Sequence, residues 1–212
     1  MFLFYNIINW LFPPLCVHCQ REGAWLCAAA ERALRLQPAR QIQSDHKYLN
    51  QVIVRGNYDH PLLAAIIQRL KYHYWSGLAE ILPTIIQPAC LLIPSLVDAL
   101  IVPVPLHARR RRHRGFNQSQ LIAQAVSQVT GWPVAELLRR RRATKSQAQL
   151  TERARHENVR DAFTLKSDLE KVPPCVIIAD DVYTTGATIN ECAAVLRQAG
   201  VKKIIALTLA KG

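Results

Sequence analysis

From residue 52 onward, short continuous apolar runs alternate with stretches whose apolar residues are spaced three or four apart. The continuous runs occupy residues 52–54, 100–105, 172–179 and 204–210 and are typical of buried strands in a parallel sheet. The helical spacing predicts helices over residues 61–70, 78–86, 121–129, 151–158 and 188–199. Strands alternating with helices predict an α/β protein, a parallel sheet flanked by helices and joined by right-handed crossovers.

The first 47 residues do not follow this pattern. Residues 1–16 are apolar but lack a basic n-region and a small-residue cleavage site, and two prolines interrupt them, so they do not read as a secretory signal. They are also too short to span a bilayer. We therefore expect an amphipathic helix packed on the body, no membrane span and a cytoplasmic protein. The predicted organisation is an appendage over residues 1–47 and one domain over residues 48–212.

The appendage carries a cluster of cysteines. Cys16 and Cys19 form a CxxC pair and Cys27 follows eight residues later, which resembles part of a zinc ribbon. Structural zinc needs four ligands, usually from two such knuckles, but the second knuckle ends at Ala30 instead of a cysteine. His46 is a conceivable but distant fourth ligand. A degenerate ribbon that has lost its metal is the favoured interpretation, and zinc binding is the alternative.

The net charge of +12 is concentrated in one part of the 212 residues. Residues 100–160 hold 13 basic and 3 acidic side chains, a net charge of +10. The run Arg109–Arg112 with Arg114 directly follows an apolar strand, so we expect a flexible cationic loop near a ligand-binding edge. The run Arg139–Arg142 has no such anchor and is interpreted as an outer patch, either solvated surface or a nucleic-acid contact. For Lys71 and the aromatic residues beside it we expect core packing rather than contact with single strands.

The most informative segment is residues 176–191, VIIADDVYTTGATINE. An apolar strand delivers Asp180 and Asp181 at its carboxyl end, where open α/β sheets bind ligands. A turn containing Thr184, Thr185 and Gly186 then leads into a helix. The backbone N–H groups at the start of this helix, together with the helix dipole, favour binding of a phosphate. The acids would repel a phosphate but accept hydrogen bonds from sugar hydroxyls or hold Mg²⁺ one step away. The pattern predicts a site for a phosphorylated sugar.

A simpler explanation of part of this segment is a helix cap. Thr188 and Glu191 have the spacing of a capping box, and the two acids would then be incidental. A cap alone does not explain two acids, three threonines and a glycine within nine positions.

This segment resembles the phosphoribosyl-diphosphate (PRPP) signature of type I phosphoribosyltransferases. Residues 66–72, 102–118 and 144–163, in the same order, are similar to the ComF/GntX family of competence-associated proteins, so the resemblance covers most of residues 16–212. It implies a type I phosphoribosyltransferase fold with a small Cys-bearing appendage. It also implies that Asp180 and Asp181 bind ribose hydroxyls and that Arg109 and Arg114 meet the diphosphate. The implied PRPP site comprises Asp180, Asp181, Val182, Tyr183, Thr184, Thr185, Gly186, Ala187 and Thr188.

The resemblance leaves two functions open. In the first, the protein is an enzyme that uses PRPP with Mg²⁺ and transfers phosphoribosyl to an unidentified acceptor base. In the second, it is a non-catalytic adaptor that binds PRPP or a nucleotide and handles single-stranded DNA beside the competence helicase and other DNA-processing proteins. The chain lacks a recognisable base-reading motif, which keeps the second open. The family's zinc ribbon, with Cys16, Cys19 and Cys27, is incomplete here.

Overall fold

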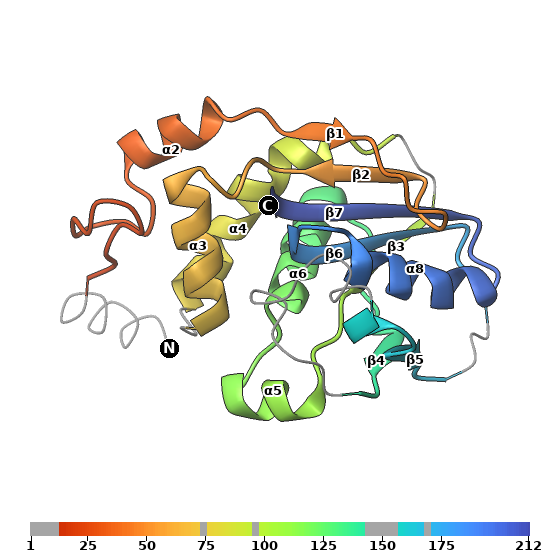
Figure 1. The fold of residues 1–212 in the computed structure, drawn as a ribbon. Helices are drawn as coiled ribbons and strands as arrows, with labels where there is room; N and C mark the ends of the chain where they lie inside the picture. The colour runs from red at the N-terminus through yellow and green to blue at the C-terminus, as the bar shows by residue number, and fades with distance from the viewer. Residues whose placement is uncertain (1–12, 73–75, 95–97, 143–156, 168–170) are drawn as a thin grey trace.

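A computed structural model describes residues 13–72, 76–94, 98–142, 157–167 and 171–212. Its centre is a five-stranded sheet with the order β1-β2-β7-β6-β3 (Figure 1). The four strands after β1 are parallel, and β1 runs antiparallel to β2 at one edge. The strands are β1 (Arg40–Ile42), β2 (Gln51–Val54), β3 (Ala99–Pro103), β6 (Cys175–Tyr183) and β7 (Lys203–Lys211). The predicted α/β architecture with a mostly parallel sheet is confirmed.

The two faces of the sheet have separate cores. Ile53, Ile177 and Ile205 pack on the face covered by the helices α3 (Pro61–Tyr72), α4 (Ser76–Cys90) and α6 (Gln118–Thr130). Their neighbours in sequence, such as Val52 and Ile178, pack on the opposite face. That face is covered by α8 (Ala187–Gln198) and a two-stranded sheet of β4 (Leu138–Arg140) and β5 (Phe163–Leu165). Because strand side chains alternate between faces, a central strand buried on both sides reads as one apolar run.

The predicted helices and strands occur with shifted ends. Strand β6 extends to Tyr183, because Val182 and Tyr183 continue to pair with Ala210 and Lys211 of β7. Of the helix predicted over 151–158, only residues 157 and 158 are described, and both are helical. The helix expected near the start of the chain lies outside the described residues. No helix in the described ranges is long and apolar enough to cross a membrane.

The cationic loop predicted after β3 is a helix, α5 (Ala108–Arg114). The side chain of His107 caps its start by accepting from the Arg109 N–H group at 3.3 Å, and Gly115 ends it in the left-handed region at φ 79°. A basic run without apolar periodicity gives no helical pattern, so the caps were the only signal. The short strands β1, β4 and β5 and the helix α2 (Ala28–Arg35) were not predicted either.

A buried arginine joins the segment before residue 48 to the main body. The Arg55 guanidinium, at the end of β2, donates to the carbonyl oxygens of Leu34, Gln37 and Ile85 at 2.8, 2.6 and 2.6 Å. It therefore links the end of α2 to the middle of α4. Since β1 also belongs to the main sheet, residues before 48 contribute directly to the α/β unit. The domain boundary at residue 48 stays a prediction.

Candidate functional site

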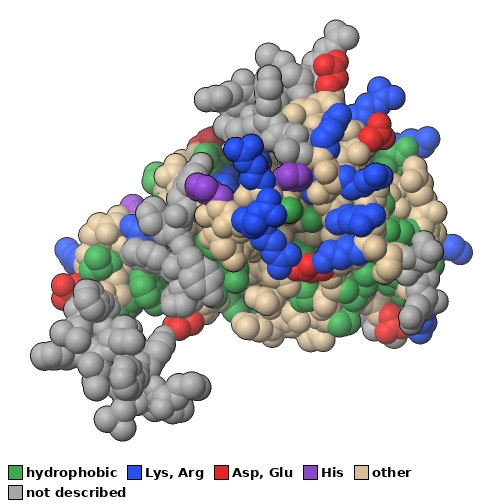
Figure 2. Space-filling view, turned by 90° about the horizontal axis from the view of Figure 1, so that it is seen from below, with side chains coloured by type: hydrophobic (Ala, Val, Ile, Leu, Met, Phe, Trp, Pro, Cys, Tyr) green, Lys and Arg blue, Asp and Glu red, His purple; other side chains and the backbone are tan. Residues whose placement is uncertain are grey.

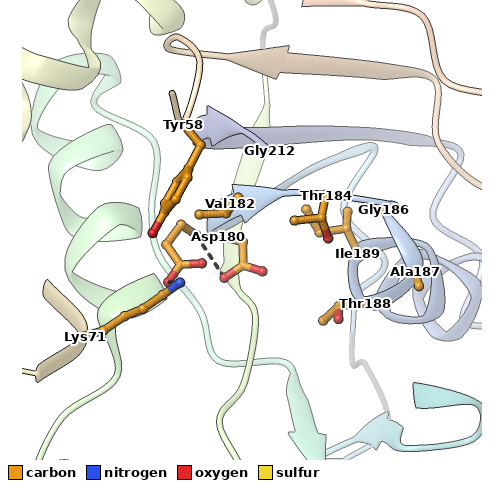
Figure 3. A pocket seen from close by; sticks show the side chains of 11 residues that line it. Tyr58, Lys71, Asp180, Val182, Thr184, Gly186, Ala187, Thr188, Ile189 and Gly212 are labelled. Atoms are coloured by element: carbon orange, nitrogen blue, oxygen red, sulfur yellow. Dashed lines mark hydrogen bonds and ion pairs between the residues drawn. The ribbon is translucent and has the colours of Figure 1, made fainter. Parts of the chain in front are cut away.

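A pocket of about 280 Å³ lies at the carboxyl ends of β2, β6 and β7, against the start of α8 (Figure 3). Parallel α/β sheets bind their ligands at this edge. Asp180, one of the two acids of β6, lies between Tyr58 and Lys71 on one side and Ala187 and Thr188 on the other. The lining residues are Tyr58, Lys71, Asp180, Asp181, Val182, Thr184, Gly186, Ala187, Thr188, Ile189 and Gly212.

Asp180 is held by donors from two elements. Its Oδ1 accepts from the Ser119 hydroxyl at 2.8 Å and from the backbone N–H group of Asp181 at 2.9 Å. Burial, followed by repulsion from Asp181, raises the pKa of Asp180 to about 7. The ligand-free pocket therefore disfavours the ionised form of Asp180, and a cation or hydrogen-bond donors at this carboxyl group would favour it.

Asp181 is buried and is met by a cation. Lys71 Nζ lies 3.3 Å from Asp181 Oδ2, and the Gln118 side-chain amide donates to the same oxygen at 3.4 Å. The expectation of core packing for Lys71 is wrong, because the end of α3 directs its ammonium group to the carboxyl edge of the sheet. Gln118 and Ser119 form the start of α6, and nothing in the local sequence pairs them with acids 63 and 61 positions away.

The turn after β6 presents the start of α8 to the pocket. Gly186 is the N-cap residue at φ 73° and has no side chain to cap the helix, and the first turn of the helix contains no acid. The Thr185 hydroxyl accepts from the Ala187 N–H group at 3.5 Å. Ala187, Thr188 and Ile189 line the pocket there. The capping box is wrong, because Glu191 accepts from the N–H group of Asp161 at 3.2 Å. The start of a helix that faces a cavity favours an anion.

The segment that contains Ser44 and His46 contacts the turn after β6. The Nε2 of His46 donates to the carbonyl oxygen of Thr185 at 2.6 Å, and the hydroxyls of Ser44 and Tyr183 lie 3.3 Å apart. A Cβ atom at Gly186 would lie 2.4 Å from His46 Nε2, so only glycine fits. Tyr183 and Thr185 do not line the pocket but fix the turn. His46 lies at this turn and not at the cysteine cluster.

The arginines predicted to meet a diphosphate lie beside the pocket and not in its lining. Arg114 donates to the Gln118 side-chain oxygen at 2.9 Å, and Gln118 in turn reaches Asp181. Arg109 is exposed on α5. Sequence reasoning missed Arg140, which lies close enough to Asp180 for their charges to interact. Burial, helped by Arg110, lowers the pKa of the Arg140 guanidinium.

The other basic residues form a basic face. Lys and Arg side chains gather around a hollow on the side of the molecule that carries α5 and the β4–β5 hairpin (Figure 2). The interpretation of Arg139–Arg142 as one outer patch is corrected, since Arg140 is partly buried over the Phe163 ring. We define the basic face by its exposed members, Arg109, Arg111, Arg112, Arg139, Arg141, Arg142 and Lys166.

The sulfur atoms of Cys16, Cys19 and Cys27 converge within 4.8 Å of one another. Burial opposes ionisation of Cys16, but the backbone N–H groups of Cys19, Cys27 and His18 lower the pKa of its thiol to about 7. No fourth ligand-type side chain joins them within the described ranges, and Ala30 at the knuckle position is buried. The cluster has the spacing of a zinc site but offers three ligands, whereas structural zinc sites use four.

Comparisons with known proteins find relatives along most of the chain, whereas no model of a protein family matches it. Competence protein F of Haemophilus influenzae is 30% identical over 204 residues, covering 93% of this chain and 85% of the relative. DNA utilization protein YhgH of Escherichia coli is 30% identical over 222 residues, covering 91% and 94%. Competence protein ComFC of Streptococcus pneumoniae is 32% identical over 110 residues, covering 52% and 47%. With this identity along almost its whole length, the chain belongs to the ComF family of competence and DNA utilization proteins.

Proposed function

We propose that the pocket binds PRPP with Mg²⁺ on a type I phosphoribosyltransferase fold and that the protein transfers phosphoribosyl to an acceptor. One observation carries the proposal. Asp180 and Asp181 face the same small cavity as the start of α8, which has a glycine at its N-cap. A phosphorylated sugar needs donors at one end and acceptors along its hydroxyl edge, and the cavity offers both.

The 5′-phosphate fits the wall formed by the turn and the start of α8. Thr184 and Thr188 offer hydroxyl groups, Gly186 allows close approach of the backbone, and the helix dipole stabilises negative charge. The contact between His46 and the carbonyl of Thr185 keeps the turn in one conformation. The phosphate therefore meets donors that are already oriented, which limits the entropy lost on binding.

The ribose fits the acidic pair. Its hydroxyls would donate to the carboxylates of Asp180 and Asp181, which must both be ionised to accept fully. Because Asp180 has a pKa of about 7, binding at or below that pH releases a proton. The same carboxylate oxygens are of the kind that Mg²⁺ prefers, and bound Mg²⁺ would neutralise the diphosphate charge.

Transfer needs no covalent nucleophile from the protein. The acceptor forms a bond to C1 while the bond from C1 to the diphosphate oxygen breaks, and the electron pair leaves with the diphosphate. Positive charge develops on the ribose in the transition state, close to the two carboxylates, which stabilise it electrostatically. On the other side, Arg114 and Gln118 lie in a chain of hydrogen bonds that ends at Asp181.

Calorimetric titration of the protein with PRPP and Mg²⁺ tests the proposal. Wild type should bind, and the double variant Asp180→Asn with Asp181→Asn should not, while its circular dichroism spectrum is unchanged. The matched control is Glu22→Gln with Asp98→Asn, two exposed acids outside the pocket lining, which should bind as wild type does. Wild-type affinity in the Asp180/Asp181 variant would exclude this site for PRPP.

A second candidate function is a non-catalytic adaptor for single-stranded DNA. The basic face beside the pocket supports it, as do the names of relatives called competence and DNA utilization proteins. Exposed arginines bind phosphates without reading sequence, and such binding weakens steeply as salt rises. Consumption of PRPP in a screen of acceptors would favour the enzyme, and a steep salt dependence without consumption would favour the adaptor.

A further inference from the structure

One wall of the pocket has no role in the proposed phosphoribosyl site. Tyr58, Lys71 and Gly212 line it, and Figure 3 shows Tyr58 and Lys71 on one side of Asp180 with Ala187 and Thr188 on the other. We infer that this wall binds the acceptor and that the acceptor is a single-ring nitrogen heterocycle carrying a negative charge. The inference rests on the proposed function and specifies its second substrate.

The position of the wall follows from strand order. A displacement at C1 places the incoming acceptor and the leaving diphosphate on opposite faces of the ribose. Strand β6, which carries the acids, lies between β3 and β7. The arginine-bearing segment follows β3, whereas Tyr58 follows β2 and Gly212 follows β7. If the diphosphate lies on the β3 side, the acceptor enters from the β7 side, between Tyr58 and Lys71.

Tyr58 is held where a planar ring could stack on it. Its backbone N–H group donates to the Lys211 carbonyl at 2.7 Å, and the Lys211 N–H group donates to the Gly56 carbonyl at 2.9 Å. The turn after β2 is therefore fastened to the end of β7. The Tyr58 ring also packs partly against the buried core. An aromatic side chain fixed in this way offers its face to a stacked ring.

Lys71 determines the charge of the acceptor. In the absence of ligand its ammonium group pairs with Asp181. Once ribose hydroxyls and Mg²⁺ engage that carboxylate, the charge of Lys71 is no longer fully compensated. A cation beside a ribose that is becoming positive disfavours the transition state, unless a negative charge lies between them. An anionic acceptor supplies that charge, and we expect it to bind after PRPP.

The size of the pocket limits the ring. Its volume of about 280 Å³ is at the lower limit of small-molecule sites, which span roughly 300–1,000 Å³, and it must also hold the phosphoribosyl group. One ring fits this space better than a fused pair. The ring nitrogen forms the bond to C1 with its own electron pair, and diphosphate leaves with the pair from the broken bond. A ring nitrogen that carries hydrogen, as in orotate, releases that proton to solvent. No oxidant or reductant is needed.

Two matched pairs of probes test the inference, nicotinate against nicotinamide and orotate against uracil. Each is titrated into the full chain by ligand-observed NMR, with and without saturating Mg²⁺ and PRPP, and diphosphate release is followed in parallel. The anionic member of at least one pair should bind about tenfold more tightly than its neutral partner, a difference of about 1.4 kcal/mol. This preference should require PRPP.

Variants assign the preference to the wall. In the PRPP-bound protein, Lys71→Met should abolish the preference for the anionic ring, and Lys71→Arg should keep it. Tyr58→Leu should weaken both members of a pair alike. Lys202→Met, an exposed lysine at the opposite end of β7, is the matched control and should behave as wild type.

Three results would overturn the inference. If wild type binds PRPP but none of the four rings, the acceptor wall is wrong while the proposed function stands. If folded Lys71→Met keeps the full preference for the anionic ring in the presence of PRPP, Lys71 does not select the charge of the acceptor. If wild type does not bind PRPP at all, the proposed function fails and the inference fails with it.

Discussion

The imidazole Nε2 of His46 lies 2.6 Å from the carbonyl oxygen of Thr185. The two residues are 139 positions apart, and His46 belongs to the segment that precedes the α/β domain in the predicted organisation. An N–H group that meets the carbonyl of a turn stabilises one conformation of that turn. The segment around His46 therefore shapes the phosphate wall of the pocket although it does not line it.

Replacing His46 with Ala should weaken phosphate binding without unfolding the protein. The lost hydrogen bond is worth about 1 kcal/mol, so the Kd for PRPP should rise roughly fivefold. Calorimetric titration measures the change. His18→Ala is the matched control, since that side chain is exposed within the cysteine segment and should leave the Kd unchanged. An unchanged Kd in His46→Ala would show that the turn keeps its conformation without this contact.

The pKa of Asp180 predicts an unusual pH dependence of stability. Burial, followed by repulsion from Asp181, raises this pKa from 3.8 to about 7, so the folded state binds the proton more tightly than the unfolded state. The free energy of unfolding should therefore fall as the pH rises from about 4 to 7, because the folded state loses this more tightly bound proton over that range. Asp180→Asn should remove this loss and stabilise the ligand-free protein by roughly 1–3 kcal/mol at pH 8.

Urea unfolding at pH 5 and pH 8 measures this effect. The stabilisation by Asp180→Asn should be present at pH 8 and much smaller at pH 5, where Asp180 is already protonated in the folded state. Binding of PRPP near pH 7 should also release protons, which calorimetry in buffers of different ionisation enthalpy detects. Equal stabilisation at both pH values would exclude a raised pKa as its cause.

Arg55 should be essential for stability. Its guanidinium is buried and donates to three carbonyl groups from α2, the residues after it and α4. Arg55→Met would leave those carbonyls without this donor and should destabilise the fold by roughly 2–4 kcal/mol. Arg35→Met is the control, because Arg35 is exposed and its ion pair with Glu31 is worth less than about 1 kcal/mol. Similar unfolding midpoints for the two variants would contradict this role.

The cysteine cluster should hold zinc weakly. Three thiols converge, but Ala30 stands where the second CxxC pair would have its second cysteine. Protein purified without added zinc should therefore contain much less than about one zinc ion per chain. Ala30→Cys supplies a thiol at the missing position of the motif and should raise the zinc content and its resistance to chelators. Elemental analysis measures both. Stoichiometric, chelator-resistant zinc in wild type would show that three thiolates are sufficient here.

The elements whose apolar pattern is strong were predictable from sequence. The run Val176–Ala179 predicts the central strand, and Asp180 and Asp181 follow it directly. One continuous segment of sequence therefore contains the two acids and the turn that line the pocket. Lys71, Ser119 and His46 reach the site from α3, α6 and the segment before β2. Their roles depend on which strand ends lie side by side in three dimensions, and the local sequence does not contain that information.

The same limit explains the error over Arg139–Arg142. Four consecutive arginines look alike in sequence, but β4 is a strand whose side chains alternate in direction. Arg139 is exposed and donates to the Thr164 hydroxyl at 3.1 Å, whereas Arg140 packs over Phe163 and interacts with Asp180. The strand therefore divides the run between the basic face and the neighbourhood of the pocket, a division that only the pairing with β5 reveals.

This division predicts two separable phenotypes. Changing Arg139, Arg141 and Arg142 to Gln removes exposed charges, so affinity for single-stranded DNA should fall and the logarithmic salt slope should shrink by roughly 0.7 for each lost phosphate contact. PRPP binding should persist. Arg140→Gln should instead weaken PRPP binding, because it removes the positive charge that favours ionised Asp180, and should change the salt slope little.

Fluorescence anisotropy with labelled oligonucleotides at several salt concentrations, together with calorimetry of PRPP, compares the two variants in both assays. Thermal unfolding checks that each is folded, since Arg140 also packs on β5. If Arg140→Gln is folded and binds PRPP as wild type does, Arg140 belongs with its neighbours on the basic face. If the triple variant binds DNA with an unchanged salt slope, its three arginines meet no phosphates. Within the basic face, contact with DNA would then fall to Lys166 and to α5, which holds its three remaining arginines, Arg109, Arg111 and Arg112.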